Sequence, residues 1–226
     1  TFPERFAIAY GDYELTYQQA NTRINKLANA LTSLGIKKGK NVAILLHNCP
    51  EFIETLFACF KAGIGTVPIN FRLHPKECSF IIDNSEAVAV VLGDDFRDSL
   101  YALKDEMPMV KHYICISEPL EGMLQYEAMP KEQYPTFIDV DVERDDLAWL
   151  FYTSGTTGQP KGAMLTHHNL MTMTMNFFAD MSPLDYRDVI LHAAPLSHGS
   201  GLYSLPNVAK GAANVILHLK TFDPKT

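Results

Sequence analysis

The sequence predicts an α/β fold in which a parallel-type sheet is covered by helices on both faces. Residues 41–46, 87–92 and 112–116 are short, mainly apolar runs without regular polar alternation. Such runs are typical of strands buried on both faces of a parallel sheet. Segments with apolar residues at helical spacing separate them, and alternation of this kind indicates an α/β domain.

The first half of the chain carries clear boundaries for these elements. Thr16 and Gln19 have the spacing of a capping box, and Gly35 suits the left-handed residue after a helix. Pro50 opens a second helix and Gly63 closes it. We therefore predict helices at 16–35, 50–63, 75–84 and 94–106, with strands at 41–46, 66–69, 87–92 and 112–116.

The second half resumes this pattern after a proline- and glutamate-rich stretch at 117–146, which is predicted to be connecting structure with one helix at 120–128. Strands are predicted at 147–152, 163–165, 189–192 and 214–217, and helices after Thr166 and at 200–210. No repeat, low-complexity tract or linker divides the chain, so a single domain is expected.

Composition argues against several classes of function. The net charge is −7 and no lysine or arginine cluster occurs, which argues against nucleic acid as the main partner. No apolar run reaches the length of a membrane span, and no secretory signal is visible. The four cysteines are scattered among apolar residues, so they are predicted to be reduced core residues of a cytoplasmic protein: Cys49, Cys59, Cys78 and Cys115.

The most informative segment runs from Tyr152 to Gly162, with the sequence YTSGTTGQPKG. Its glycines allow backbone N–H groups to converge on one point. Its hydroxyl groups add donors, and Lys161 adds a mobile positive charge. The segment is therefore a candidate phosphate-binding loop. It matches neither the Walker pattern nor the dinucleotide fingerprint, and by composition alone it could equally be a surface turn.

The order of residues in this loop resembles the phosphate-loop signature of the adenylate-forming (AMP-binding) superfamily, and in particular its acyl-CoA synthetase branch. Three further segments resemble motifs of that family and follow in its order: Leu15–Tyr17, Phe60–Asn70 and Ala194–Gly199. The resemblance covers about residues 6–224. It implies that residues 1–226 are an incomplete N-terminal AMP-binding domain, without the remainder of that domain and the C-terminal lid domain.

The resemblance also implies a two-step reaction. A carboxylate attacks the α-phosphate of ATP to give an acyl-adenylate and pyrophosphate, and coenzyme A then takes the acyl group. ATP, Mg²⁺ and coenzyme A are the implied cofactors and co-substrates, and a fatty acid is the expected small-molecule partner. An aryl acid, another adenylating reaction and an oligomeric state stay open.

The family implies roles for particular residues. The predicted ATP-phosphate contacts are Thr153, Ser154, Gly155, Thr156, Thr157, Gly158 and Lys161. Magnesium is expected to be held through the ATP phosphates, with Thr156 beside it and no direct protein ligand. His198 and Gly199 are predicted to border the carboxylate substrate, and no residue of this chain is assigned as catalytic.

Three other interpretations are weighed against this one. The chain contains no Y-G-x-T-E segment, ribose-binding aspartate or C-terminal lysine of the family, so we expect residues 1–226 alone to be inactive. A non-catalytic nucleotide- or acyl-binding module is the alternative. His167 and His168 are adjacent on a predicted helix and point about 100° apart, which disfavours a metal pair. Ser200 is not in a G-x-S-x-G elbow, which disfavours a serine hydrolase.

Overall fold

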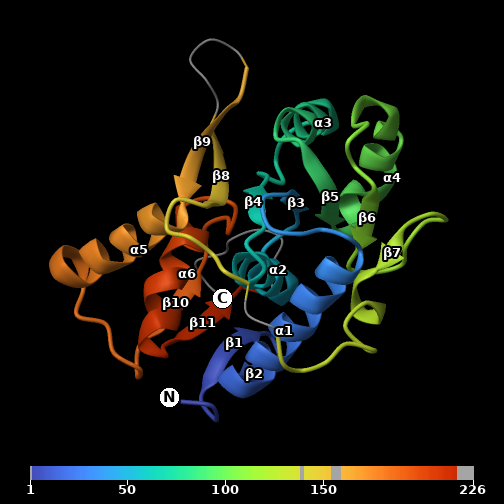
Figure 1. Ribbon diagram of the computed structural model, residues 1–226. Helices are drawn as coiled ribbons and strands as arrows, with labels where there is room; N and C mark the ends of the chain where they lie inside the picture. The colour runs from blue at the N-terminus through green and yellow to red at the C-terminus, as the bar shows by residue number, and fades with distance from the viewer. Residues whose placement is uncertain (1, 138–139, 154–158, 218–226) are drawn as a thin grey trace.

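The computed structural model describes residues 2–137, 140–153 and 159–217, and it contains two sheets (Figure 1). The larger sheet has the strand order β7-β6-β5-β3-β4-β8-β9 and is parallel except for the antiparallel β8–β9 pair. Its strands are β3 (Asn41–Leu45), β4 (Gly65–Pro68), β5 (Ala87–Leu92), β6 (His112–Cys115), β7 (Leu124–Gln125), β8 (Leu147–Thr153) and β9 (Lys161–Thr166).

The smaller sheet has the order β10-β11-β1-β2, formed by β1 (Phe6–Tyr10), β2 (Tyr13–Thr16), β10 (Val189–His192) and β11 (Ala213–Ile216). β1 and β2 were not predicted. They form an antiparallel hairpin in which Tyr10 pairs with Tyr13 and Gly11 adopts a φ of 59°. The Gly-Asp pair in this turn is a hairpin signal, but the strands on either side are only five and four residues long, so their alternation is weak.

The helices cover the larger sheet on both faces, as predicted. α1 (Tyr17–Ser33) and α2 (Pro50–Lys61) pack with β1 in one apolar cluster, and α3 (Pro75–Asn84) and α4 (Asp94–Tyr101) contribute to a second cluster. Successive residues of β3 alternate between the clusters, so this strand is buried on both faces. Helix α6 (Gly199–Lys210) packs against β10 and β11 of the smaller sheet, and α5 (His167–Asn176) packs against α6 and β9 (Figure 1).

The predicted helix boundaries are confirmed where the sequence carries a capping signal. Gln19 N–H donates to Thr16 Oγ1 and the Thr16 N–H donates to Gln19 Oε1, which completes the capping box. Gly35 and Gly63 adopt φ values of 82° and 64° after their helices. Thr166 caps α5 in the same way as Thr16 caps α1. Local hydrogen bonding therefore sets these boundaries.

Two predicted helices are wrong in extent. Residues 120–128 form no α-helix, because Gly122 adopts a φ of 87°, Leu124–Gln125 pairs with β6, and a short 3₁₀ turn follows. The helix predicted at 94–106 ends at Tyr101, and a separate 3₁₀ turn spans Lys104–Glu106. This break allows both Leu100 and Met107 to enter the second apolar cluster.

A partly buried ionic network holds the connecting segment against α1 and α2. Arg23 Nε donates to Glu54 Oε1 at 2.6 Å, and Arg23 Nη2 donates to Glu127 Oε1 at 2.5 Å. Tyr126 OH donates to Glu54 Oε2 at 3.1 Å. Desolvation raises the pKa of Glu54, while the bonds to Arg23 act in the opposite direction. Tertiary contacts therefore determine the conformation of this segment, and its local sequence pattern led to the wrong prediction of a helix.

The four cysteines are buried and form no disulfide, which confirms their predicted place in the core. Desolvation raises the pKa of the Cys49 and Cys59 thiols and raises that of Cys78 to about 12. In the described part of the chain, no helix is both long and apolar enough to span a bilayer.

Candidate nucleotide and carboxylate site

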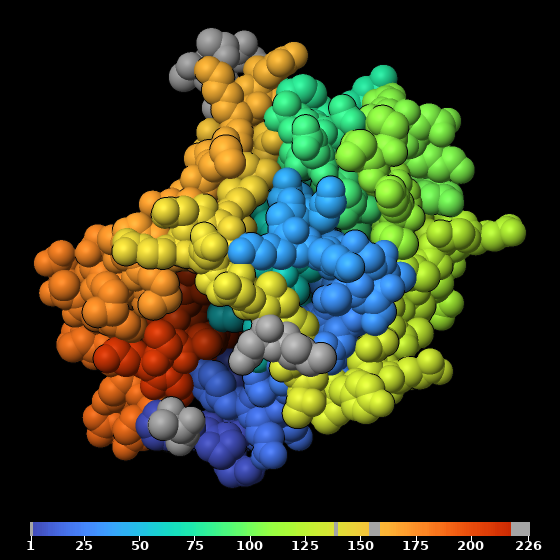
Figure 2. Space-filling model, in the orientation of Figure 1, coloured from blue at the N-terminus to red at the C-terminus, as the bar shows by residue number. Residues whose placement is uncertain are grey.

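The candidate site begins at the open end of the β8–β9 hairpin. Thr153 and Lys161 are paired across this antiparallel ladder, and both are exposed. Figure 2 shows the hairpin standing out from the body of the molecule. The other predicted phosphate contacts lie between these two residues and outside the described residues: Ser154, Gly155, Thr156, Thr157 and Gly158.

The two faces of β8 have different surroundings. Leu150 and Tyr152 belong to the second apolar cluster, and Tyr152 OH donates to Asn84 Oδ1 at 2.7 Å. Side chains alternate along a strand, so Trp149, Phe151 and Thr153 lie on the opposite face. The rings of Trp149 and Phe151 have centroids 6.3 Å apart. The face that carries Thr153 is thus lined by aromatic rings.

His198 lies on this same face of β8. Its ring centroid is 5.6 Å from that of Phe151, which is two residues before Thr153. Ser197 Oγ is 3.3 Å from His198 Nδ1, and the His198 side chain is half-buried. Gly199 begins α6, and a Cβ placed on it would have no heavy atom within 4 Å. The structure therefore brings His198 and Gly199 to the strand that leads into the predicted phosphate loop.

Ser200 belongs to a buried polar network that sequence reasoning missed. Its Oγ is 2.8 Å from Nδ1 of His192, and His192 Nε2 is 3.1 Å from Asn214 Oδ1. Because Asn214 Nδ2 donates to the Ala7 carbonyl, we assign the His192 proton to Nε2, and Nδ1 then accepts from Ser200. Desolvation lowers the pKa of His192. The network links α6 to β10, β11 and β1.

A second group of polar residues, which was not predicted from the sequence, lies after the carboxyl ends of β3, β4 and β5. His47 Nε2 is 3.0 Å from Asp95 Oδ2, and the His47 ring lies 4.5 Å from the ring of Phe71. The Arg72 guanidinium is 5.4 Å from the centroid of the same Phe71 ring. These residues come from two loops and the first turn of α4, so no local spacing in the sequence indicates that they meet.

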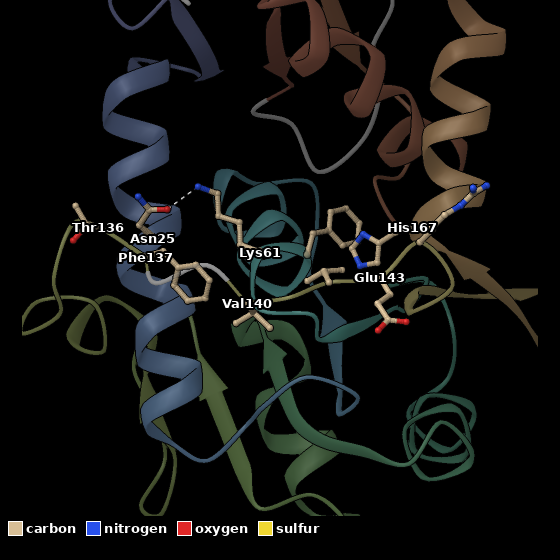
Figure 3. Close-up of a pocket in the computed structure, with 10 residues that line it drawn as sticks. Asn25, Lys61, Thr136, Phe137, Val140, Glu143 and His167 are labelled. Atoms are coloured by element: carbon tan, nitrogen blue, oxygen red, sulfur yellow. Dashed lines mark hydrogen bonds between the residues drawn. The ribbon is translucent and has the colours of Figure 1, made fainter.

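A cavity of about 700 Å³ lies away from the predicted site, and none of the described site residues lines it. It is bounded by α1, α2, the start of α5 and residues 136–137 and 140–144. Figure 3 shows Lys61 directed toward Asn25 at one end and His167 at the other. The His167 ring packs edge-on against Phe60, and its Nε2 atom is buried without a hydrogen-bond partner, whereas His168 contacts Arg144. The adjacent histidines thus have separate surroundings.

The methionine-rich stretch of α5 is only partly buried. Met171 and Met175 are 62% and 59% exposed, so they do not belong to the described core. Met173 and Phe177 are half-buried and line a cavity of about 550 Å³ next to Tyr203 of α6.

Comparison with known proteins places this geometry in a family. A family model described as "AMP-binding enzyme" matches residues 1–226. A feruloyl-CoA synthase from an Amycolatopsis species is 36% identical over 98% of this chain and 42% of its own length. The chain thus spans about two fifths of that curated relative.

Solved structures show the same similarity. An anthranilate-CoA ligase in complex with anthranoyl-AMP is matched with a TM-score of 0.88 at 27% identity, over 95% of this chain and 42% of that one. A fatty acyl-CoA synthetase from Mycobacterium tuberculosis is matched with a TM-score of 0.86 at 28% identity, over 98% of this chain and 43% of that one. This chain belongs to the AMP-binding enzyme family, whose matched members are CoA ligases of the adenylate-forming type.

Proposed function

We propose that residues 1–226 bind the nucleotide and the acid in an ATP-dependent carboxylic acid–CoA ligase that works through an acyl-adenylate. The observation that carries this proposal is the contact between Phe151 and His198. It holds the histidine beside the strand that leads into the Thr153–Lys161 loop. With the loop binding phosphates and the imidazole beside the strand that precedes it, the arrangement suits the joining of a carboxylate to the α-phosphate of ATP.

In this proposal the loop binds the β- and γ-phosphates. Its backbone N–H groups and hydroxyls are donors that meet the negative charge developing on the departing pyrophosphate. Thr153 and Lys161 are exposed as the last pair of the ladder, one on each side of the loop, so both are accessible to a ligand. Magnesium, bound to the phosphates with Thr156 beside it, would neutralise part of the same charge.

His198 is proposed to orient the carboxylate next to the α-phosphate. Its ring is held from one side by Phe151, and Ser197 Oγ lies within reach of Nδ1, which leaves Nε2 for a ligand. Gly199 follows without a side chain, and the space around its Cα is open. An acid could therefore approach His198 over Gly199 without meeting a side chain at that position.

Two classes of acid are candidates for the substrate. A fatty acid is our first choice, since the half-buried side chains of Met173 in α5 and Phe177 just after it line a cavity together with Tyr203 of α6. An aryl acid is the second, because two of the matched proteins are named for feruloyl and anthranilate substrates. The aromatic face of β8, formed by Trp149 and Phe151, is compatible with either class.

We further propose that this chain acts within a longer, cytoplasmic polypeptide, called the full-length enzyme below. The length of its relatives supports this proposal. Residues 1–226 alone would then bind ATP without turning it over. The alternative of a non-catalytic binding module makes the same prediction for the isolated chain but not for the full-length enzyme.

The test is ATP–pyrophosphate exchange by the full-length enzyme with a panel of fatty and aromatic acids, followed by detection of the acyl-CoA product. Acid-dependent exchange, with product formed only when coenzyme A is added, is the expected result. The acid with the highest kcat/KM identifies the substrate class. Binding of ATP without exchange for any acid would favour the non-catalytic module, and exchange by residues 1–226 alone would overturn the requirement for a longer chain.

A further inference from the structure

The side chain of Asn48 bridges the two sheets immediately before the His198 turn. Asn48 lies in the loop between β3 and α2, and Nδ2 donates to the carbonyls of His192 and Ala194 at 3.3 and 2.8 Å. Its Oδ1 accepts from the Leu196 N–H at 2.8 Å. The three backbone groups belong to alternate residues. The Asn48 carboxamide therefore pairs with this segment in the way that the backbone of a neighbouring β-strand pairs with a strand.

The segment bonded by Asn48 leads directly into His198. The His198 N–H donates to the Pro195 carbonyl, and the His198 carbonyl accepts from the Gly201 N–H. Leu196 is 1% exposed, and its N–H would lose the Asn48 Oδ1 acceptor if this side chain were removed. The opposite side of the turn packs tightly, because a Cβ on Gly201 would lie 2.0 Å from the Leu196 carbonyl oxygen. The turn is therefore fixed from two sides.

We propose that Asn48 is a positioning residue that sets where the His198 imidazole lies relative to β8. This inference rests on the proposed function of His198. β3 and β8 belong to the larger sheet, whereas β10 belongs to the smaller one. Three hydrogen bonds from Asn48 hold the end of β10 and the residues after it in a fixed position relative to the larger sheet. A displacement of His198 by about 1 Å would be enough to slow adenylate formation strongly.

The kinetic test is a double-mutant cycle in the full-length enzyme, with Asn48→Ala, His198→Ala and the double variant. We expect Asn48→Ala alone to lower kcat/KM for the acid in ATP–pyrophosphate exchange by on the order of tenfold or more. In the His198→Ala background the same change should alter kcat/KM by less than about threefold, because the side chain that it positions is already absent. The loss of thermal stability caused by Asn48→Ala should be the same in both backgrounds.

This pattern separates positioning from a general structural role. A merely structural role would lower activity and stability equally in both backgrounds, and that result would overturn the inference. Asn29→Ala is the matched control, since Asn29 Nδ2 also donates to two backbone carbonyls, those of Tyr134 and Thr136, but far from the site. The control should leave kcat/KM within about twofold of the wild type.

A second variant covers the case in which Asn48→Ala does not fold. Asn48→Asp keeps an acceptor for the buried Leu196 N–H and loses both donors, so it should fold and still lower kcat/KM in a His198-dependent way. A wild-type enzyme that shows no exchange with any acid would refute the proposed function before Asn48 is tested. An active wild type with an equally active Asn48→Asp variant would refute the role of Asn48 alone.

Discussion

Gly162 lies directly opposite Tyr152 in the β8–β9 ladder, and a Cβ placed on it would lie 2.9 Å from the Tyr152 ring. The ring cannot easily move aside, because its hydroxyl donates to Asn84 and the side chain is buried. A glycine at the end of the proposed phosphate loop therefore has a packing role in addition to its backbone freedom.

We expect Gly162→Ala to destabilise the hairpin by about 1–3 kcal/mol, since the added methyl group overpacks against Tyr152. The free energy of unfolding in urea measures this, and ATP binding should weaken with it. Combining the change with Tyr152→Leu, which shortens the opposing side chain, should reduce the cost of Gly162→Ala. An equal cost in both backgrounds would show that the contact with Tyr152 is not the cause.

Two glycines of α6 make a matched pair. At Gly201 a Cβ would lie 3.0 Å from the Trp149 ring and closer still to the Leu196 carbonyl, whereas Gly199 is surrounded by open space. Gly201→Ala should therefore lower the free energy of unfolding by about 2–3 kcal/mol. Gly199→Ala should leave it unchanged or raise it by less than about 1 kcal/mol.

The only tryptophan of the chain reports on this contact, so its fluorescence provides an independent measurement. The emission of Trp149 should shift in Gly201→Ala and stay as in the wild type in Gly199→Ala. Equal stability of the two variants would contradict the close packing of α6 on β8.

Stability should fall on acidification because of His192. Desolvation lowers its pKa below the ordinary 6.5, and the hydrogen bond from Nε2 to Asn214 only partly opposes this. The unfolded chain therefore binds the proton at a higher pH than the folded one, so the contribution of His192 is fully present above about pH 6.5 and is lost as pH falls toward its folded pKa.

The measurement is the free energy of unfolding between pH 7.5 and 5 for the wild type and His192→Gln. The pKa of His167 is also lowered by burial, so the difference between the two proteins, and not the wild-type curve alone, isolates His192. We expect the variant to lose less stability than the wild type over this range. Parallel curves would mean that His192 is not held neutral.

The loop hydroxyls should matter for chemistry more than for folding. Loss of one donor that stabilises developing charge costs on the order of 3 kcal/mol. Thr156→Ala or Thr157→Ala in the full-length enzyme should therefore slow adenylate formation by roughly a hundredfold. Ser33→Ala, which removes a hydroxyl at an exposed position on α1, is the control. Wild-type rates of ATP–pyrophosphate exchange in both loop variants would remove the loop from the mechanism.

His198→Ala should raise KM for the acid or lower kcat while leaving the KM for coenzyme A little changed. The reason is that the imidazole faces the same strand surface as Thr153 and touches only the acid and the α-phosphate in the proposed complex. His112→Ala, at the start of the distant strand β6, is the matched control. Unchanged kinetics in His198→Ala would make the histidine a structural residue.

The sequence predicts those parts of the fold that local interactions determine. Capping residues such as Thr16 and Thr166 give helix starts to within a residue, and the apolar runs at β3 and β5 give the buried strands. The hairpin of β1 and β2 and the segment around Tyr126 depend on partners far along the chain. Tyr126, for example, bonds Glu54 at a separation of 72 residues.

The same distinction applies to the candidate site. The proposed phosphate loop and the segment that contains His198 are each contiguous in sequence, so residue order alone indicates them as candidates. Asn48 and His192 act through partners that are up to 148 residues away, and neither has a distinctive local pattern. Such residues can be identified only from the structure, which shows the contacts between the two sheets.

The central claim is that the loop between β8 and β9 holds the triphosphate of ATP beside His198. The most direct test is a crystal structure of the full-length enzyme with a non-hydrolysable ATP analogue and magnesium. We predict the β- and γ-phosphates within hydrogen-bond distance of residues 153–158, with the His198 ring facing the α-phosphate. A triphosphate bound elsewhere, for instance in the cavity between α1, α2 and α5, would contradict the account.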